Sequence, residues 1–275
     1  MRFDFVKSHG LGNDYLVVDA RQLGFELTPA RIRRICNRHT GVGADGILVL
    51  VETTEADFAV RIFNPDGSEA EKSGNGLRIF AKFLYDHDYT TRTDFTVHTR
   101  GGTVRARLLV ADRRVSAVRV DMGRADIDRS LTTLPVAGEV LRVVSLSVGN
   151  PHCVTIVDEL SRSQLLRLGP LIEHHVAFPN RTNVQFVQVV SRNAVRALVW
   201  ERGAGHTLAS GSSSCAVAAA CFAEGLVDGQ VTVHLEGGDL AIEVDQDLNV
   251  IMTGPVEEIC SGTFSREFRE RLRYS

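Results

Sequence analysis

Apolar and polar positions along the chain predict short strands and a few helices. Strands are predicted where β-branched residues are continuous or alternate with polar ones, and helices where apolar residues recur at helical spacing. The predicted strands cover 15–19, 47–51, 103–108, 118–123, 153–158, 240–244 and 249–254. The predicted helices cover 29–38, 77–84, 161–174 and 215–222. The run at 216–223 is apolar on almost every side, which predicts a buried helix.

The two halves of the chain repeat each other at a shift of about 137 residues. Gly12-Asn13 falls on Gly149-Asn150, and each pair leads into a predicted strand. Ser73 falls on Ser210, and each precedes a predicted apolar helix. We therefore expect an α+β fold of two pseudo-symmetric domains, each a strand barrel wrapped around a central helix. A helix on one face of a flat sheet is the alternative. The expected domains are 1–115 with 262–275, and 116–261.

The composition is that of an ordinary globular protein. Of 275 residues, 44% are hydrophobic and 24% are charged, and the net charge of −3 comes without a charged tail, so no nucleic-acid partner is expected. The longest apolar runs are far shorter than the roughly 20 residues of a membrane helix, and the first residues lack the apolar core of a signal peptide. Five cysteines without a C-x-x-C pair argue against a disulfide framework or a zinc site. We expect a protein of the reducing cytoplasm, with no membrane contact and no metal.

Two loops rich in glycine and serine precede the two apolar helices. They cover 64–76 and 201–214, and contain Ser73 and Ser210. Each serine can cap its helix, and the glycines leave backbone N–H groups free to hold an anion at the positive end of the helix dipole. Ordinary capping is the alternative for either loop alone. Two such loops at equivalent positions favour a shared anion site, which suits racemisation at a carboxylate-bearing carbon. The sequence lacks the phosphate-loop, dinucleotide and H-E-x-x-H motifs, so no cofactor is expected.

Seven short segments spread over the whole chain resemble one known family. They are 9–15 (HGLGNDY), 40–46 (TGVGADG), 64–68 (NPDGS), 74–78 (GNGLR), 149–152 (GNPH), 181–184 (RTNV) and 201–205 (ERGAG). With them the chain resembles the cofactor-independent diaminopimelate epimerases. The resemblance implies two pseudo-symmetric domains, each a strand barrel around a central helix, which agrees with the repeat.

The resemblance also implies an active site. Family members use two cysteines, one removing the α-proton as a thiolate and one delivering a proton to the other face. The matching positions here are Ser73 and Ser210. The candidate bases are titratable residues in or near the two loops, of which His152 and Glu201 are the ones we expect to act and Glu69 and Glu71 are expected to be solvated: Asp66, Glu69, Glu71, His152, His206 and Glu201. The residues expected to bind substrate are Asn13, Asn64, Asn150, Asn183, Glu201 and Arg202 at the non-reacting end of an amino acid, and the backbone N–H groups of Gly74, Asn75, Gly211 and Ser212 at the reacting carboxylate.

The serines leave three hypotheses open, because a serine hydroxyl needs an adjacent base whereas a cysteine ionises at a pKa of about 8.5. The first is epimerisation of LL- to meso-diaminopimelate, with the serines in the cysteine roles. The second is dehydration or isomerisation of a related amino acid, as in a related isomerase of phenazine biosynthesis. The third is amino-acid binding without turnover. Ser213 stands where the family usually has glycine, and Ile79 where it often has cysteine. These further differences favour natural divergence of the two serine positions over replacement of two cysteines in the laboratory. A homodimer through exposed strands is compatible with the sequence.

Overall fold

The computed structural model describes residues 3–112 and 114–274, and the chain divides into two compact units. The first unit takes in the described residues up to Val120 and from Pro255 onward, and the second runs from Asp121 to Gly254. These bounds differ by a few residues from those expected from the sequence. The reason at the second boundary is that strand β19 (Glu257–Gly262) pairs with β1 (Phe5–Gly10), so its residues fold with the first unit.

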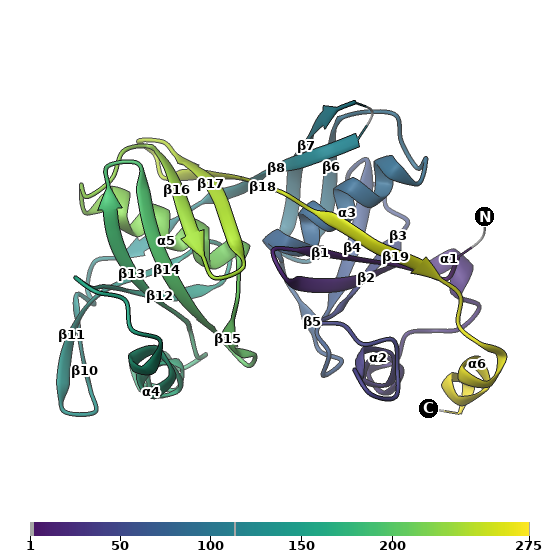
Figure 1. The fold of residues 1–275 in the computed structure, drawn as a ribbon, viewed down its shortest axis with the longest axis horizontal. Coiled ribbons are helices and arrows are strands. Elements are labelled where there is room, and N and C mark those ends of the chain that lie inside the picture. The colour runs from purple at the N-terminus through teal and green to yellow at the C-terminus, as the bar shows by residue number, and fades with distance from the viewer. Residues whose placement is uncertain (1–2, 113, 275) are drawn as a thin grey trace. The chain divides into compact units, whose positions relative to one another are not determined.

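The first unit is built on one curled sheet (Figure 1). Its other strands are β2 (Asn13–Asp19), β3 (Ile47–Val51), β4 (Phe58–Phe63), β5 (Glu69–Ala70), β6 (Asp94–Thr99), β7 (Gly102–Ala111) and β8 (Arg114–Arg124). The strand order is β19-β1-β2-β3-β4-β6-β7-β8, with β5 paired to β4. Two neighbouring pairs, β2 with β3 and β4 with β6, are parallel. β8 continues past Val120 into the second unit.

The second unit has the same topology. Its strands are β9 (Asp126–Asp128), β10 (Thr133–Val136), β11 (Glu139–Ser147), β12 (Pro151–Ile156), β13 (Asn183–Ser191), β14 (Ala194–Glu201), β15 (Gly205–Thr207), β16 (Gln230–Leu235), β17 (Gly238–Val244) and β18 (Asn249–Gly254). The order is β9-β11-β12-β13-β14-β16-β17-β18, with β10 paired to β11 and β15 to β14. The parallel pairs, β12 with β13 and β14 with β16, match those of the first unit. The repeat predicted from the sequence is confirmed.

Each unit holds one buried helix, α3 (Gly74–Asp86) or α5 (Gly211–Ala223). α5 packs against β11, β12, β13, β14, β16, β17 and β18, so the strands surround it (Figure 1). Its side chains from Cys215 to Cys221 are small and fully buried, which lets the strands approach on every side. α3 packs against β1, β2 and β7, and only its last residues reach solvent. The barrel prediction is confirmed, and the flat-sheet alternative is wrong.

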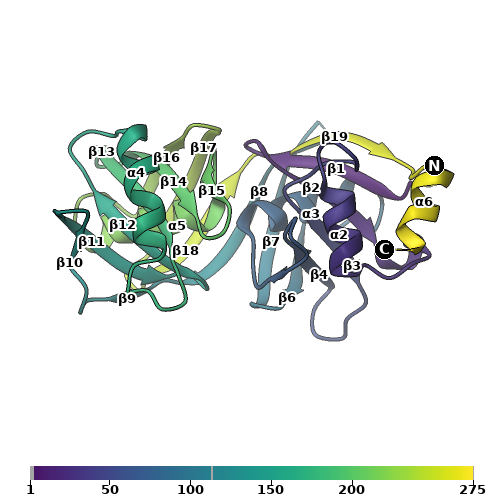
Figure 2. The ribbon, with the colours of Figure 1, turned by 90° about the horizontal axis from the view of Figure 1, so that it is seen from below.

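Two outer helices, α2 (Pro29–Cys36) and α4 (Arg162–Glu173), lie on the outside of the strands (Figure 2). They end one or two residues earlier than the sequence predicted. The sequence analysis missed α1 (Ala20–Leu23) and α6 (Arg266–Arg273), although Ser265 caps α6 and its apolar residues recur four apart. None of the helices that the structure describes has the length and apolar content for a membrane crossing.

Candidate active site

Both central helices begin at the serines that the sequence singled out. Ser73 Oγ accepts a hydrogen bond from the backbone N–H of Gly76 at 3.1 Å, which makes it the N-cap of α3. Ser210 Oγ accepts from the N–H of Ser213 at 3.4 Å and caps α5 with nearly the same backbone angles. The N–H groups of the first helical turn have no carbonyl partner within the helix. Each helix start therefore carries positive potential close to a serine hydroxyl.

The two helix starts share a second contact pattern. Asn75 Nδ2, on the first turn of α3, donates to Asn13 Oδ1 at 3.0 Å. In the second unit Asn150 Nδ2 reaches Ser212 Oγ, on the first turn of α5, at 3.5 Å. Both pairs lie 62 residues apart in the sequence. The repeat thus places four predicted substrate-binding residues beside the two serines in equivalent ways.

Ser73 has a side-chain neighbour that the sequence analysis missed. The phenol oxygen of Tyr15, on β2, lies 3.3 Å from Ser73 Oγ. Tyr15 is buried, with 6% of its surface exposed. In the sequence repeat, Tyr15 aligns with His152 of the second unit. Two different titratable side chains at one repeated position are the signal that could have pointed to Tyr15 as a site residue.

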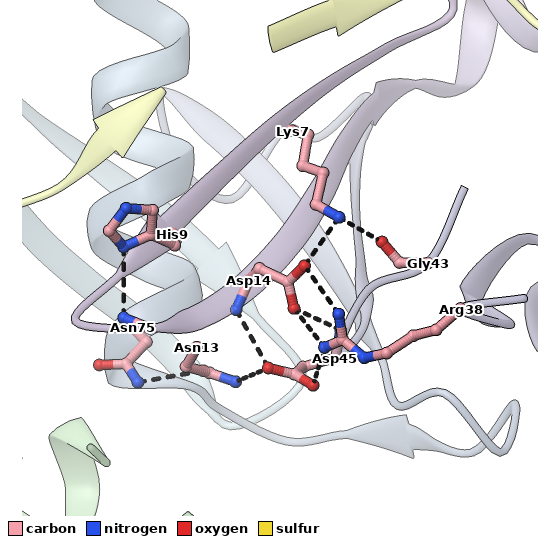
Figure 3. Close-up of polar contacts among 9 residues, drawn as sticks. Lys7, His9, Asn13, Asp14, Arg38, Gly43, Asp45 and Asn75 are labelled. Atoms are coloured by element: carbon pink, nitrogen blue, oxygen red, sulfur yellow. Dashed lines mark hydrogen bonds and ion pairs between the residues drawn. The ribbon is translucent and has the colours of Figure 1, made fainter. Parts of the chain in front are cut away.

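An ionic cluster holds Asn13 in the first unit (Figure 3). The Asp45 carboxylate accepts hydrogen bonds at 3.1 Å from Asn13 Nδ2 and from the Asp14 backbone N–H. Arg38 donates at 2.7 Å both to the Asp14 carboxylate and to the Asp45 carboxylate. Lys7 approaches Asp14 at 2.9 Å. Burial alone would raise the pKa of Asp14, but the hydrogen bonds from Arg38 and Lys7 outweigh it and hold that pKa below its usual value.

Asp14→Asn is expected to lower the free energy of unfolding by about 2 kcal/mol at pH 7, because it leaves the largely buried Lys7 ammonium without its carboxylate. The folded-state pKa of Asp14 is lowered, so this stabilisation is present above the unfolded value of about 4 and is lost as the pH falls through the folded value. Urea unfolding of both proteins at neutral pH and at steps below about pH 4 should show a difference that shrinks in acid.

Asp94→Asn is the matched control for this measurement. The Asp94 carboxylate pairs with Arg105 and Arg107 on the protein surface, and an exposed pair of this kind contributes below about 1 kcal/mol. Equal losses in the two variants, or a difference for Asp14→Asn that stays constant in acid, would contradict the role assigned to the cluster.

His152 lies at the centre of a neutral network in the second unit. Its Nε2 donates to Asn150 Oδ1 at 2.9 Å, and its Nδ1 accepts from Gln185 Nε2 at 3.0 Å. Gln185 Nε2 also donates to Ser213 Oγ at 2.9 Å, and the Ser213 backbone N–H caps onto Ser210. Burial lowers the pKa of His152 to about 3, and nearby Arg202 acts in the same direction. The imidazole is therefore neutral. Hydrogen bonds connect it to the Ser210 hydroxyl through Gln185 and Ser213, and the sequence analysis missed Gln185.

The loop after β14 carries two further predicted residues, Glu201 and Arg202. Asn183 Oδ1 accepts from the Arg202 backbone N–H at 3.0 Å, and Asn183 Nδ2 donates to the Pro151 carbonyl at 2.8 Å. Glu201 ends β14, opposite Gly205 of β15. Asn183 therefore positions the loop through backbone contacts.

A buried carboxylate, Glu173 of α4, fixes the other end of this loop. It accepts from the Gly203 backbone N–H at 2.9 Å and from Trp200 Nε1 at 2.8 Å, and no local sequence pattern points to this role. In the first unit Asn64, at the position matching Glu201, donates from Nδ2 to Ser68 Oγ at 2.9 Å. The predicted binding residues are thus grouped within each unit around the helix starts and the loops next to them.

The fold is shared with two solved structures. A probable proline racemase from Agrobacterium radiobacter K84 matches with a TM-score of 0.78 at 15% identity, covering 96% of this chain and 93% of that one. A hydroxyproline epimerase from Agrobacterium vitis matches with a TM-score of 0.75 at 15% identity, covering 94% of this chain and 90% of that one. At such low identity the likeness defines the class of fold, an α+β fold of two strand barrels with one central helix each.

Sequence similarity narrows this class to one family. The family model described as diaminopimelate epimerase matches residues 5–127 and 144–259. Diaminopimelate epimerase 2 of Nostoc sp. is 42% identical over 278 residues, which cover 96% of this chain and 96% of that protein. This chain belongs to the diaminopimelate epimerase family.

Proposed function

We propose that this protein is an isomerase that inverts one α-carbon of diaminopimelate, converting the LL- to the meso-form for lysine and peptidoglycan precursors without pyridoxal phosphate. Membership of the diaminopimelate epimerase family over nearly the whole chain is the observation that carries the proposal. The capped serine at the start of each buried helix adds a local argument, because each provides a hydroxyl beside backbone N–H groups suited to a carboxylate.

In this proposal Ser73 and Ser210 stand in the positions of the two cysteines of the family. One serine accepts the α-proton and the other returns a proton to the same carbon. The backbone N–H groups of Gly74 and Asn75, and of Gly211 and Ser212, hold the reacting carboxylate and stabilise the negative charge that develops beside it. Oriented N–H groups at a helix start need no reorganisation during the reaction, which supports this role.

The non-reacting amino-acid end is assigned to a set of amide and charged side chains. Their amides can donate to a carboxylate and accept from an ammonium group, while the two charged members pair with the opposite charges of a zwitterion. The set is Asn13, Asn64, Asn150, Asn183, Glu201 and Arg202. Support comes from the rigid settings described above: Asp45 holds Asn13, and the backbone at Pro151 and Arg202 holds Asn183.

His152 and Glu201 are proposed to assist the serines. Because burial lowers the pKa of His152 to about 3, its imidazole is too weak a base to take a proton from a serine hydroxyl, so His152 acts by holding Asn150 and, through Gln185, the first turn of α5. Glu201 is the carboxylate proposed to take up a proton in the second unit.

The test is incubation of the purified chain with LL- or meso-diaminopimelate and chiral separation of the products, alongside a panel of other α-amino acids. Both starting isomers should approach the same mixture, and the other amino acids should keep their configuration. A product that is not an epimer would favour dehydration or isomerisation. Binding of diaminopimelate without conversion would favour a non-catalytic role, and either result would contradict the proposal.

The cellular setting and the assembly are proposed from the cysteines and the exposed strands. All five cysteines are free thiols, and four of them are buried, which suits the reducing cytoplasm. A homodimer is proposed through exposed strands, of which β19 exposes Ile259 and Cys260. Sedimentation of the purified chain at a mass of about one protomer across micromolar concentrations would contradict the dimer.

A further inference from the structure

The two helix-cap serines have different side-chain neighbours. Ser73 Oγ lies 3.3 Å from the phenol oxygen of Tyr15. At the equivalent position of the second unit stands His152, whose two ring nitrogens are bound to Asn150 and Gln185. The hydroxyl group of Ser73 therefore touches a side chain that can gain and lose a proton, and the corresponding side chain near Ser210 is directed to other partners.

The chain makes room for the Tyr15 ring by a glycine on the neighbouring strand segment. Gly46 directly precedes β3, which pairs with β2. A Cβ atom at Gly46 would lie 2.5 Å from the Phe63 carbonyl oxygen and 2.6 Å from Tyr15 Cε1, closer than real side chains allow. The matching position in the second unit is Asn183, paired with His152. The buried tyrosine and the glycine beside it therefore form one local arrangement that belongs to the first unit.

We infer that Tyr15 is the proton-relay partner of Ser73, a positioning residue that acts on the substrate only through the serine hydroxyl. The inference rests on the proposed function. The relay starts from the neutral phenol, in the direction in which Ser73 delivers a proton. Ser73 Oγ–H protonates the carbon, whose electron pair forms the new C–H bond, while the Tyr15 phenol passes its own proton to Ser73 Oγ and is left as the phenolate. In the reverse direction the Cα–H bond breaks, Ser73 Oγ takes that proton, and the serine proton returns to the phenolate, so atoms and charge balance.

The chemistry of the two hydroxyls supports this direction of exchange. A phenol, with an ordinary pKa of about 10, is far more acidic than an aliphatic alcohol, so the phenol can replace the proton that the serine gives up. The oxygen separation of 3.3 Å is long for an O–H···O hydrogen bond. Such contacts in ligand-free sites commonly shorten when the substrate binds.

The test measures diaminopimelate α-hydrogen exchange in four proteins: the unmodified chain, Tyr15→Phe, Ser73→Cys, and the double variant. In the serine background, Tyr15→Phe should lower kcat at least about tenfold and leave KM within about twofold. In the cysteine background the same change should cost less than about threefold, because a thiol ionises without help from a phenol. This dependence on residue 73 is the readout that a merely structural tyrosine would not give.

Tyr89→Phe is the control. Tyr89 is a tyrosine of the same unit whose hydroxyl donates to Asp19 at 2.9 Å, and its loss should leave kcat unchanged. Equal losses from Tyr15→Phe in both backgrounds, or no loss in the serine background, would overturn the relay while the proposed function stands. An unmodified chain that exchanges no α-hydrogen would instead contradict the proposed function itself. Urea unfolding midpoints confirm that the variants compared are folded.

Discussion

Replacing Ser73 or Ser210 by alanine is expected to lower the rate of diaminopimelate epimerisation by about 10³-fold, in line with the loss of a general acid or base. Each variant keeps the helix and its backbone N–H groups but loses the hydroxyl to which we assign the proton transfer. If the two serines form one acid–base pair, the double variant should be scarcely slower than either single one, because residues that act as a unit are not additive. Initial rates of isomer formation, followed by chiral separation, measure this directly.

Ser161→Ala is the matched control for these variants. Ser161 caps the outer helix α4 by accepting from the Gln164 N–H, so it is a helix-cap serine without a proposed catalytic role. Its loss should cost about 1 kcal/mol of stability and leave the rate unchanged. If Ser73→Ala lost no more activity than Ser161→Ala, the serine would be only a cap, and the proposed chemistry would be wrong.

The double variant Ser73→Cys/Ser210→Cys is expected to epimerise about 10²-fold faster than the unmodified chain near neutral pH. A thiol has a pKa of about 8.5, and the start of a helix lowers it further, so a cysteine gains the reactive form that a serine does not reach alone. The flanking backbone need not change, because serine and cysteine both place their hydrogen-bonding atom at the γ position. Initial rates and their pH dependence in the two proteins are the measurement.

The outcome of this second experiment also separates the alternatives. Activity in both proteins, with the cysteine variant faster, supports a serine-based epimerase. Activity in the cysteine variant alone would mean that the binding residues suit an epimerase while the native serines perform other chemistry or none. A cysteine variant no faster than the unmodified chain would contradict the view that proton transfer at these two positions limits the rate.

The two units differ in how they stabilise equivalent amides. In the first unit charged groups hold Asn13, since Asp45 accepts from its amide and Arg38 bridges to Asp14. In the second unit Asn150 is held by the neutral ring of His152, which is itself bound to Gln185. The repeat of the backbone therefore carries two electrostatic environments beside the two serines.

The fold could be predicted largely from the sequence. The periodicity of apolar residues shows each helix or strand locally, and the internal repeat shows that the two halves share one arrangement of these elements. The serine caps of α3 and α5 could be predicted because a matching glycine- and serine-rich loop precedes each apolar helix. The sequence does not predict that β19 joins the first unit, because its pairing with β1 connects opposite ends of the chain and leaves no local signal.

The missed site residues share one property, which is that their roles depend on contacts distant in sequence. Tyr15 and Ser73 are 58 residues apart, and Gln185 lies 28 residues from Ser213. Glu173 meets the loop after β14 from the end of an outer helix. Strand patterns give the face of Tyr15 and Gln185 but not their partners, which depend on how α3 packs against β2 and α5 against β13.

The most direct test of the proposed acid–base pair is to follow LL-diaminopimelate in D₂O with the unmodified chain at low conversion. Chiral separation followed by mass spectrometry gives the deuterium content of product and recovered substrate. Two serines acting on one α-carbon predict one deuterium in the meso product and almost none in the recovered LL-isomer, because the proton returned comes from the second group. Deuterium in the recovered LL-isomer without meso product, or no deuterium in either, would contradict the account.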